Sequence, residues 1–190
     1  MARRSYCTRV DQLPRNRVLR AVLIVLAFQT AWAACAYGAV HDLPQVGVLA
    51  CFACIVVGLA LAPYRQGLLA LVLALGLYGL IAETIILGAG LISFNAHWPH
   101  SALAPLWIIG LWMAFATLIE PAFGWLQGRP LMASALGAAA GPISYSAAMR
   151  LGALHFNQPE WLGIAAIGLT WAVAMPFALR LSDRLQGRKP

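Results

Sequence analysis

Residues 67–94 read GLLALVLALGLYGLIAETIILGAGLISF, an apolar run in which Glu83 is the single charged side chain. A helix that crosses a bilayer needs roughly 20 consecutive, mostly apolar residues. This run is too long for one straight span, so we expect the helix to loosen at Gly88-Ala-Gly90, before Phe94. A strong tilt of the helix is the alternative. The stretch predicts a membrane-spanning helix that carries one buried acid.

Five more runs of the same kind flank this one, separated by short segments. They are Val18–Gly38, Leu43–Ala62, Ala102–Leu126, Leu131–Met149 and Trp161–Leu181. The chain is 62% hydrophobic and 10% charged, whereas a soluble domain carries roughly 25% charged residues. We predict an all-α integral membrane bundle of six transmembrane helices over residues 18–182, with basic tails at 1–17 and 183–190.

Prolines divide the predicted helices. Pro44, Pro105 and Pro159 fall at or near predicted helix starts, where a missing amide proton costs least. Pro63, Pro99 and Pro130 mark connections. An alternative for the first run is a cleaved signal peptide, but the aromatic residues Trp32 and Tyr37 favour a helix that ends at the membrane interface.

The distribution of Lys and Arg predicts the orientation. Of the 13 basic residues, Arg150 alone falls on one side of the six-helix map, and the other side holds all the rest. The positive-inside rule then places both termini in the cytoplasm of a bacterial inner membrane. The net charge of +7 is explained by topology, so we predict membrane lipids and no nucleic acid as partners.

Glu83 is the strongest candidate for a functional residue. An ionisable group in the apolar layer is costly unless it faces the bundle interior and finds a partner. Gly76 and Gly79 lie on the same helical face as Glu83, so another helix can approach it closely. Glu83 is either part of a site or a structural carboxyl that locks helix packing, and both interpretations stand.

Two residues of the fifth run lie at a depth similar to that of Glu83. Arg150 ends this run on the outer side and is a candidate ion-pair partner of Glu83; Tyr145 lies just inside it. We predict a substrate-binding site formed by Glu83, Tyr145 and Arg150 around an outward cavity. The alternative for Arg150 is snorkelling toward lipid headgroups, and no residue is assigned a catalytic role.

Other polar residues within the runs favour structural roles. Glu120 is expected to snorkel or to pair with Arg129 or Arg180. Gln29 and Thr30 are interpreted as hydrogen-bonding contacts between helices.

Small residues dominate the fifth run, where Gly137 and Gly141 are four residues apart. This spacing lets two helix backbones meet closely. We expect packing within the bundle. A homo-oligomer formed through Gly137 and Gly141 is the alternative.

Histidines and cysteines offer no clear metal or redox site. His97-x-x-His100 has a spacing found in zinc sites, but topology alone gathers the polar residues of that face. We predict no metal and no cofactor, with His97 and His100 as the candidates if a metal binds. Cys51-x-x-Cys54 is interpreted as a pair of small packing residues.

Several short motifs occur together along the chain. They are Phe28-Gln29-x-x-Trp32, Gly90-Leu-Ile-Ser-Phe94, Leu111-Trp112-x-x-Phe115-Ala116 and Gly141-Pro142-x-x-Tyr145. The set resembles an uncharacterised family of small bacterial multi-pass inner-membrane proteins, catalogued as a domain of unknown function. The resemblance implies a membrane protein whose genes are often found among those for fatty-acid modification.

Three functions remain open at this point. The first is a membrane protein that binds or moves a lipid or other amphipathic small molecule through an outward-facing cavity. The second is a membrane-embedded enzyme, or enzyme subunit, in lipid modification. The third is a scaffold without a ligand.

The predicted orientation is tested by reporter fusions at Lys189, Asp42 and Gln127. Reporters at Lys189 and Gln127 should be active only in a cytoplasmic assay, because the basic segments stay inside. A reporter at Asp42 should be active only in a periplasmic assay. A periplasmic signal at Lys189, or a cytoplasmic one at Asp42, would contradict the six-helix topology.

Overall fold

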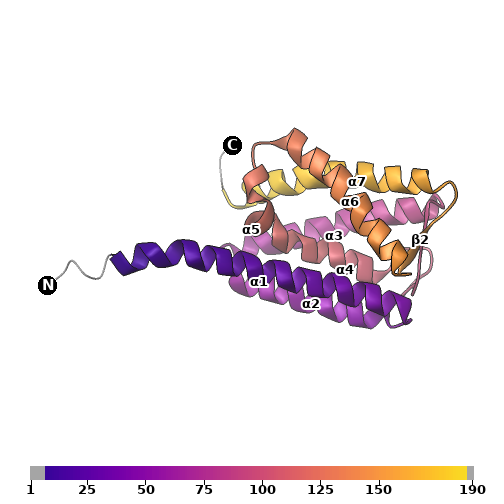
Figure 1. The fold of residues 1–190 in the computed structure, drawn as a ribbon, viewed down its shortest axis with the longest axis horizontal. Coiled ribbons are helices and arrows are strands. Elements are labelled where there is room, and N and C mark those ends of the chain that lie inside the picture. Colours follow the sequence, from indigo (N-terminus) through magenta and orange to yellow (C-terminus); the bar gives the residue numbers. More distant parts are fainter. Residues whose placement is uncertain (1–6, 188–190) are drawn as a thin grey trace.

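The computed structural model describes the backbone of residues 7–187 and the side chains of residues 17–187, as a bundle of helices (Figure 1). Its α-helices are α1 (Cys7–Val40), α2 (Pro44–Leu61), α3 (Arg65–Gly88), α4 (Leu106–Phe115), α5 (Ile119–Phe123), α6 (Pro130–Arg150) and α7 (Glu160–Leu185). Two 3-10 helices, η1 (Ala116–Leu118) and η2 (Gly124–Leu126), flank α5, and the two strands are β1 (Ile92–Phe94) and β2 (Leu154–Phe156).

Five segments of the described chain are long and apolar enough to cross a membrane. They are Arg17–Val40, Pro44–Leu61, Arg65–Gly88, Leu106–Leu126 and Glu160–Leu185, with mean hydropathies from 1.7 to 2.2. The protein is therefore an all-α, multi-pass membrane protein, as the sequence predicts. The remaining long helix, α6, is not among these five, so its place as a sixth span stays a prediction.

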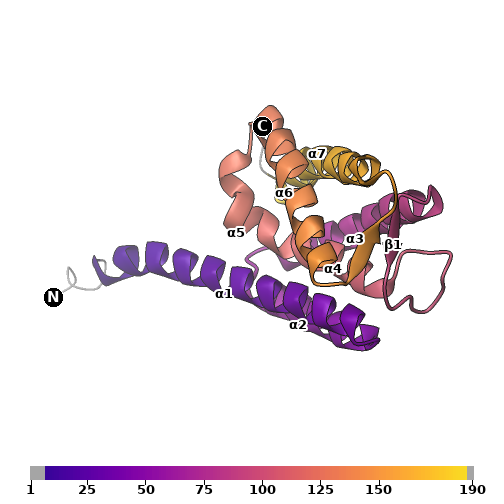
Figure 2. The same ribbon diagram turned by 45° about the vertical axis from the view of Figure 1, so that its right-hand side comes forward.

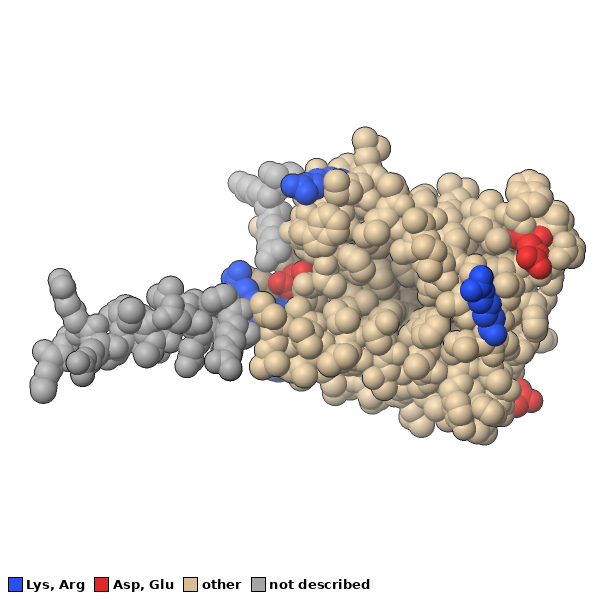
Figure 3. All heavy atoms as spheres, in the orientation of Figure 1, with Lys and Arg blue, Asp and Glu red and all other residues tan. Residues whose placement is uncertain are grey.

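Large apolar side chains cover much of the outer surface. Leu131 is 85% exposed, and Leu49, Phe52 and Ile85 are each more than 60% exposed. On the face drawn in Figure 3, the charged side chains lie toward the two ends of the bundle, and uncharged residues fill the region between them. This arrangement suits a surface that faces lipid between two polar interfaces.

The helices pack as two outer pairs around a centre. Helices α1 and α2 run side by side along one flank, and α6 and α7 form a pair on another (Figures 1 and 2). Between them, α3 and α4 contact each other, α4 also contacts α2, and α3 contacts α7. Helix α1 begins and α7 ends at the same end of the bundle (Figure 1).

A short sheet closes the opposite end. Strands β1 and β2 pair antiparallel, with Ile92 opposite Phe156 and Phe94 opposite Leu154. Asn157 Nδ2 donates to the Gly90 carbonyl at 2.8 Å, and Gly90 has a φ of 69°, which suits glycine. The helix does loosen after Gly88, as predicted, but the pairing of the two loops was not predicted.

The fourth predicted helix, 102–126, differs from the structure in its first residue and in its continuity. The helix begins at Leu106, with Pro105 as its N-cap residue, and the run breaks into η1, α5 and η2 instead of continuing as one helix. Pro121 explains the first break, because it has no backbone N–H to donate to the carbonyl four residues before it, at Thr117, and its ring collides with that carbonyl.

Three other boundaries differ from the sequence prediction. Pro130 does not lie in a connection but begins α6. Helix α1 begins at Cys7, inside the predicted tail 1–17, and α7 continues to Leu185, inside the predicted tail 183–190. The rest of these tails, residues 1–6 and 188–190, lies outside the described residues. Pro44 and Pro159 do mark helix starts, as predicted.

Glycines in α6 permit close contact with α7, as predicted. A Cβ atom at Gly137 would lie 2.2 Å from the Trp171 carbonyl oxygen, and one at Gly141 would lie 2.4 Å from Trp171 Cδ1. The space beside both glycines is thus filled by α7. A homo-oligomer formed through Gly137 and Gly141 would need a face that α7 already covers.

We predict that Gly141→Leu destabilises the protein by about 1–3 kcal/mol or more, because the new side chain must displace the Trp171 ring. The measurement is thermal unfolding in detergent. Ala139→Leu is the matched control, since Ala139 is an exposed residue of the same helix. Equal stability of the two variants would contradict the packing of α6 on α7.

Candidate functional site

A groove of about 450 Å³ runs along the bundle between α1 and α6, with α4 as its floor. Its lining is mostly aromatic and aliphatic and includes Phe28, Trp32, Trp107, Trp112 and Trp171. The face drawn in Figure 3 is hollowed near its middle, away from the charged ends. Because the lining residues of α1 and α4 belong to the apolar spans, the groove lies at the depth of the membrane.

Aromatic rings form one end of the groove. The Trp112 and Trp171 indoles stack with centroids 4.4 Å apart, and Phe115 meets Trp171 edge-on at 4.9 Å. Phe28 of α1 lies 6.1 Å from Phe115. These contacts between α1, α4 and α7 fix the shape of this end of the groove, since each ring packs against another.

The carboxyl group of Glu83 lies behind these aromatic rings and is fully buried. The Trp112 indole Nε1 donates to Glu83 Oε1 at 2.9 Å, and the Tyr145 hydroxyl donates to the same oxygen. The other oxygen, Oε2, has no hydrogen-bond partner among the described residues. Trp112 and Tyr145 line the groove but Glu83 does not, so Glu83 positions two lining residues from behind.

Two glycines of α3 allow α4 to come close enough for the contact between Trp112 and Glu83. A Cβ atom at Gly79 would lie 2.3 Å from Trp112 Cγ, and one at Gly76 would lie 2.7 Å from Met113 Cγ. The absence of side chains one and two turns before Glu83 therefore lets α4 approach α3 until Trp112 reaches the carboxyl. The prediction that another helix packs on this face of α3 is confirmed.

The predicted ion pair between Glu83 and Arg150 is wrong. The partners of Glu83 are Trp112 and Tyr145, whereas Arg150 is exposed at the last residue of α6 and does not line the groove. Similar depth along two helices does not fix which side chains face each other. Of the three residues predicted to form the site, the structure brings Glu83 and Tyr145 together and leaves Arg150 apart.

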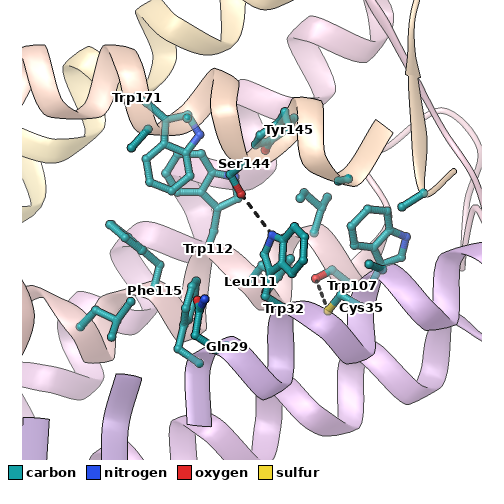
Figure 4. Close-up of a pocket in the computed structure, with 18 of the residues that line it drawn as sticks. Gln29, Trp32, Cys35, Trp107, Leu111, Trp112, Phe115, Ser144, Tyr145 and Trp171 are labelled. Carbon is teal, nitrogen blue, oxygen red and sulfur yellow. Dashed lines mark hydrogen bonds between the residues drawn. The ribbon is translucent and has the colours of Figure 1, made fainter. Parts of the chain in front are cut away.

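Two polar features of the groove were not predicted, one a hydrogen bond and the other a side chain that is unpaired among the described residues. The Trp32 indole Nε1 of α1 donates to Ser144 Oγ of α6 at 3.1 Å, across the groove (Figure 4). Gln29, one turn before Trp32, also lines the groove and is exposed. The motif that joins Gln29 and Trp32 was visible in the sequence, but nothing in it indicated Ser144 as a partner.

The predicted roles of Thr30, Gln29 and Glu120 are corrected by the structure. Thr30 Oγ1 donates to the Leu26 carbonyl of its own helix at 2.9 Å, and no hydrogen bond joins Gln29 to another described residue. Neither therefore connects two helices. Glu120 forms an ion pair with Arg20 of α1 rather than with Arg129 or Arg180.

The histidines form no metal site in the part of the chain that the structure describes. Within it, no group of three or more His, Cys, Asp or Glu side chains is arranged to hold a metal. The Ala102 amide donates to His100 Nδ1 at 3.1 Å, so that nitrogen accepts a hydrogen bond within its own loop. His97, the other candidate, is exposed in the same loop.

The cysteines of the second predicted helix are buried, as expected of packing residues. Cys51 Sγ lies 3.5 Å from Cys35 Sγ of α1. Gly47 completes this contact, because a Cβ there would lie 2.8 Å from Cys35 Sγ. The small side chains therefore hold α1 against α2.

We predict that Glu83→Leu destabilises the protein by about 2–5 kcal/mol, because the Trp112 N–H and the Tyr145 O–H both lose their acceptor while buried. Glu83→Gln keeps an acceptor oxygen and is the matched control, with a much smaller effect. Thermal unfolding in detergent measures both.

A double-mutant cycle checks the assignment of partners. Adding Tyr145→Phe to Glu83→Leu should recover part of the loss, since the unpaired hydroxyl is removed, whereas adding Arg150→Met should be additive. Coupling of Glu83 to Arg150 instead of to Tyr145 would contradict the structure.

Comparison with known proteins places the chain in a family. No curated protein matches the chain, and no solved structure does. The family model described as "Protein of unknown function (DUF2878)" matches residues 21–177, which include nearly all of the helical bundle and every residue of the groove. The chain therefore belongs to this family of unknown function.

Proposed function

We propose that the protein binds a lipid or another amphipathic small molecule in the groove between α1, α4 and α6. The observation that carries the proposal is the groove itself, a cavity of about 450 Å³ with an apolar, aromatic lining. This volume lies within the range of about 300–1,000 Å³ that is usual for small-molecule sites. A hydrocarbon chain fits such a lining and reaches it from the membrane without passing through water.

The proposal assigns separate roles to the predicted site residues. Tyr145 and Trp112 contribute to the wall that contacts the ligand, and Glu83 fixes them from the far side. Arg150 lies at the end of α6, outside the lining, and has no part in the proposed site. An enzyme that uses Glu83 for acid–base chemistry has less support, since the carboxyl is enclosed by its own partners and is 0% exposed.

The same proposal includes six spans, with both termini in the cytoplasm of a bacterial inner membrane. Helix α6 has 21 residues, which is enough to cross a bilayer, and it packs along α7. Support for the orientation comes from Arg20, Arg129 and Arg180, which belong to the basic side of the sequence map.

The experiment that tests the groove is lipid mass spectrometry of the purified protein. Ala140 is an exposed residue of α6 that lines the groove, so Ala140→Phe fills it without crowding the core. We predict that this variant loses most of the lipid that copurifies with the native protein, by about tenfold.

Ala139→Phe is the matched control, because Ala139 is exposed on the same helix but does not line the groove. It should retain the lipid bound by the native protein. If the two variants carry the same lipids in the same amounts as the native protein, the groove is not the binding site and the proposal fails.

A further inference from the structure

The polar groups of the groove indicate what kind of molecule it holds. We infer, resting on the proposed function, that the occupant is a long-chain lipid whose polar group is uncharged, a hydroxyl or an ester, held at mid-membrane by Gln29 and Ser144. Gln29 has no hydrogen-bond partner among the described residues, and Ser144 faces the mostly apolar groove from the opposite wall. Their position and lack of charge define the chemistry of the ligand.

Gln29 is the first support for this inference. It lies near the middle of the span Arg17–Val40, is exposed, and lines the groove. Its carboxamide offers two N–H donors and one acceptor oxygen, and no described residue hydrogen-bonds to it. Because an unpaired amide in hydrocarbon costs free energy, a ligand with a hydrogen-bonding group is favoured at this point.

Ser144 supplies a second polar group from the opposite wall. Its Oγ accepts from the Trp32 indole, and the hydroxyl proton is still available to donate. Figure 4 shows the Gln29 side chain reaching into the groove from α1, on the same helix as Trp32, with Ser144 facing them from α6. A polar group between the two helices could therefore contact both walls.

The lining excludes a charged headgroup at this depth. None of the residues that line the groove is Asp, Glu, Lys, Arg or His. A phosphate or carboxylate placed there would be removed from water without a counter-charge, which is far more costly than burying a hydroxyl or an ester. Arg20, the cation nearest this region in the α1 sequence, is already paired with Glu120.

The test uses four probes that share one dibrominated octadecyl chain and end as an alcohol, a methyl ester, a plain hydrocarbon or a phosphate. Bromine quenches tryptophan fluorescence, and Trp32, Trp107, Trp112 and Trp171 all line the groove. Quenching titrations of the full-length protein in detergent give an affinity for each probe. The Ala140→Phe variant, measured in parallel, gives the part of the quenching that does not arise in the groove.

We predict that the alcohol and the ester bind about fivefold more tightly than the hydrocarbon, the effect of roughly one hydrogen bond. Their advantage over the phosphate should be larger, because burying a charge without a counter-charge costs more. Gln29→Met should remove this preference, so that the alcohol and the ester bind no more tightly than the hydrocarbon. Thr30→Val is the matched control, since the Thr30 hydroxyl bonds to its own helix, and it should keep the preference.

The possible failures are distinguishable. If the hydrocarbon or the phosphate binds as tightly as the alcohol and the ester, and Ala140→Phe abolishes that binding, then the groove holds a lipid but the inferred class is wrong. The same holds if Gln29→Met leaves the preference intact. If Ala140→Phe alters no titration, the proposed function fails, and the inference about the ligand fails with it.

Discussion

The buried carboxyl group of Glu83 is the constraint on which the rest of the bundle depends. An acid within an apolar membrane layer is tolerated only with partners, and here one oxygen accepts hydrogen bonds from Trp112 of α4 and Tyr145 of α6. Glu83 therefore fixes both helices relative to α3. Since the two donors line the groove and the acceptor does not, the shape of the groove depends on a residue that a ligand does not touch.

Glycine and tryptophan extend this arrangement across four helices. The Trp112 ring fills the space beside Gly79 of α3, and the Trp171 ring of α7 fills the space beside Gly141 of α6. The two indoles stack on each other at 4.4 Å, so α3, α4, α7 and α6 are joined through one continuous set of contacts. Such packing matters more in a membrane than in water, because the hydrophobic effect does not drive helices together in lipid.

The sequence predicted the helices well and their contacts poorly, for physical reasons. Hydropathy, proline and glycine act locally, so the helical runs and the loosening after Gly88 could be predicted. The partner of Glu83 depends on which helix packs on α3, and depth along the chain favoured Arg150 over Trp112. The pairing of Ile92 with Phe156 joins segments far apart in the chain, and strands of three residues leave no periodic pattern to detect.

The two kinds of polar residue in the bundle also differ in what they imply for function. Glu83 is the more costly group by itself, but two protein donors serve it and no surface of it is exposed. Gln29 is uncharged and less costly, yet it is exposed in the groove without a protein partner. Glu83 is enclosed within the fold, and although its oxygen Oε2 has no described partner, Glu83 does not line the groove. The Nε1 atoms of Trp107 and Trp171 also lack a hydrogen-bond partner among the described residues but are buried, whereas a molecule outside the chain can reach the exposed Gln29 carboxamide. The proposed ligand is therefore better inferred from Gln29 than from Glu83.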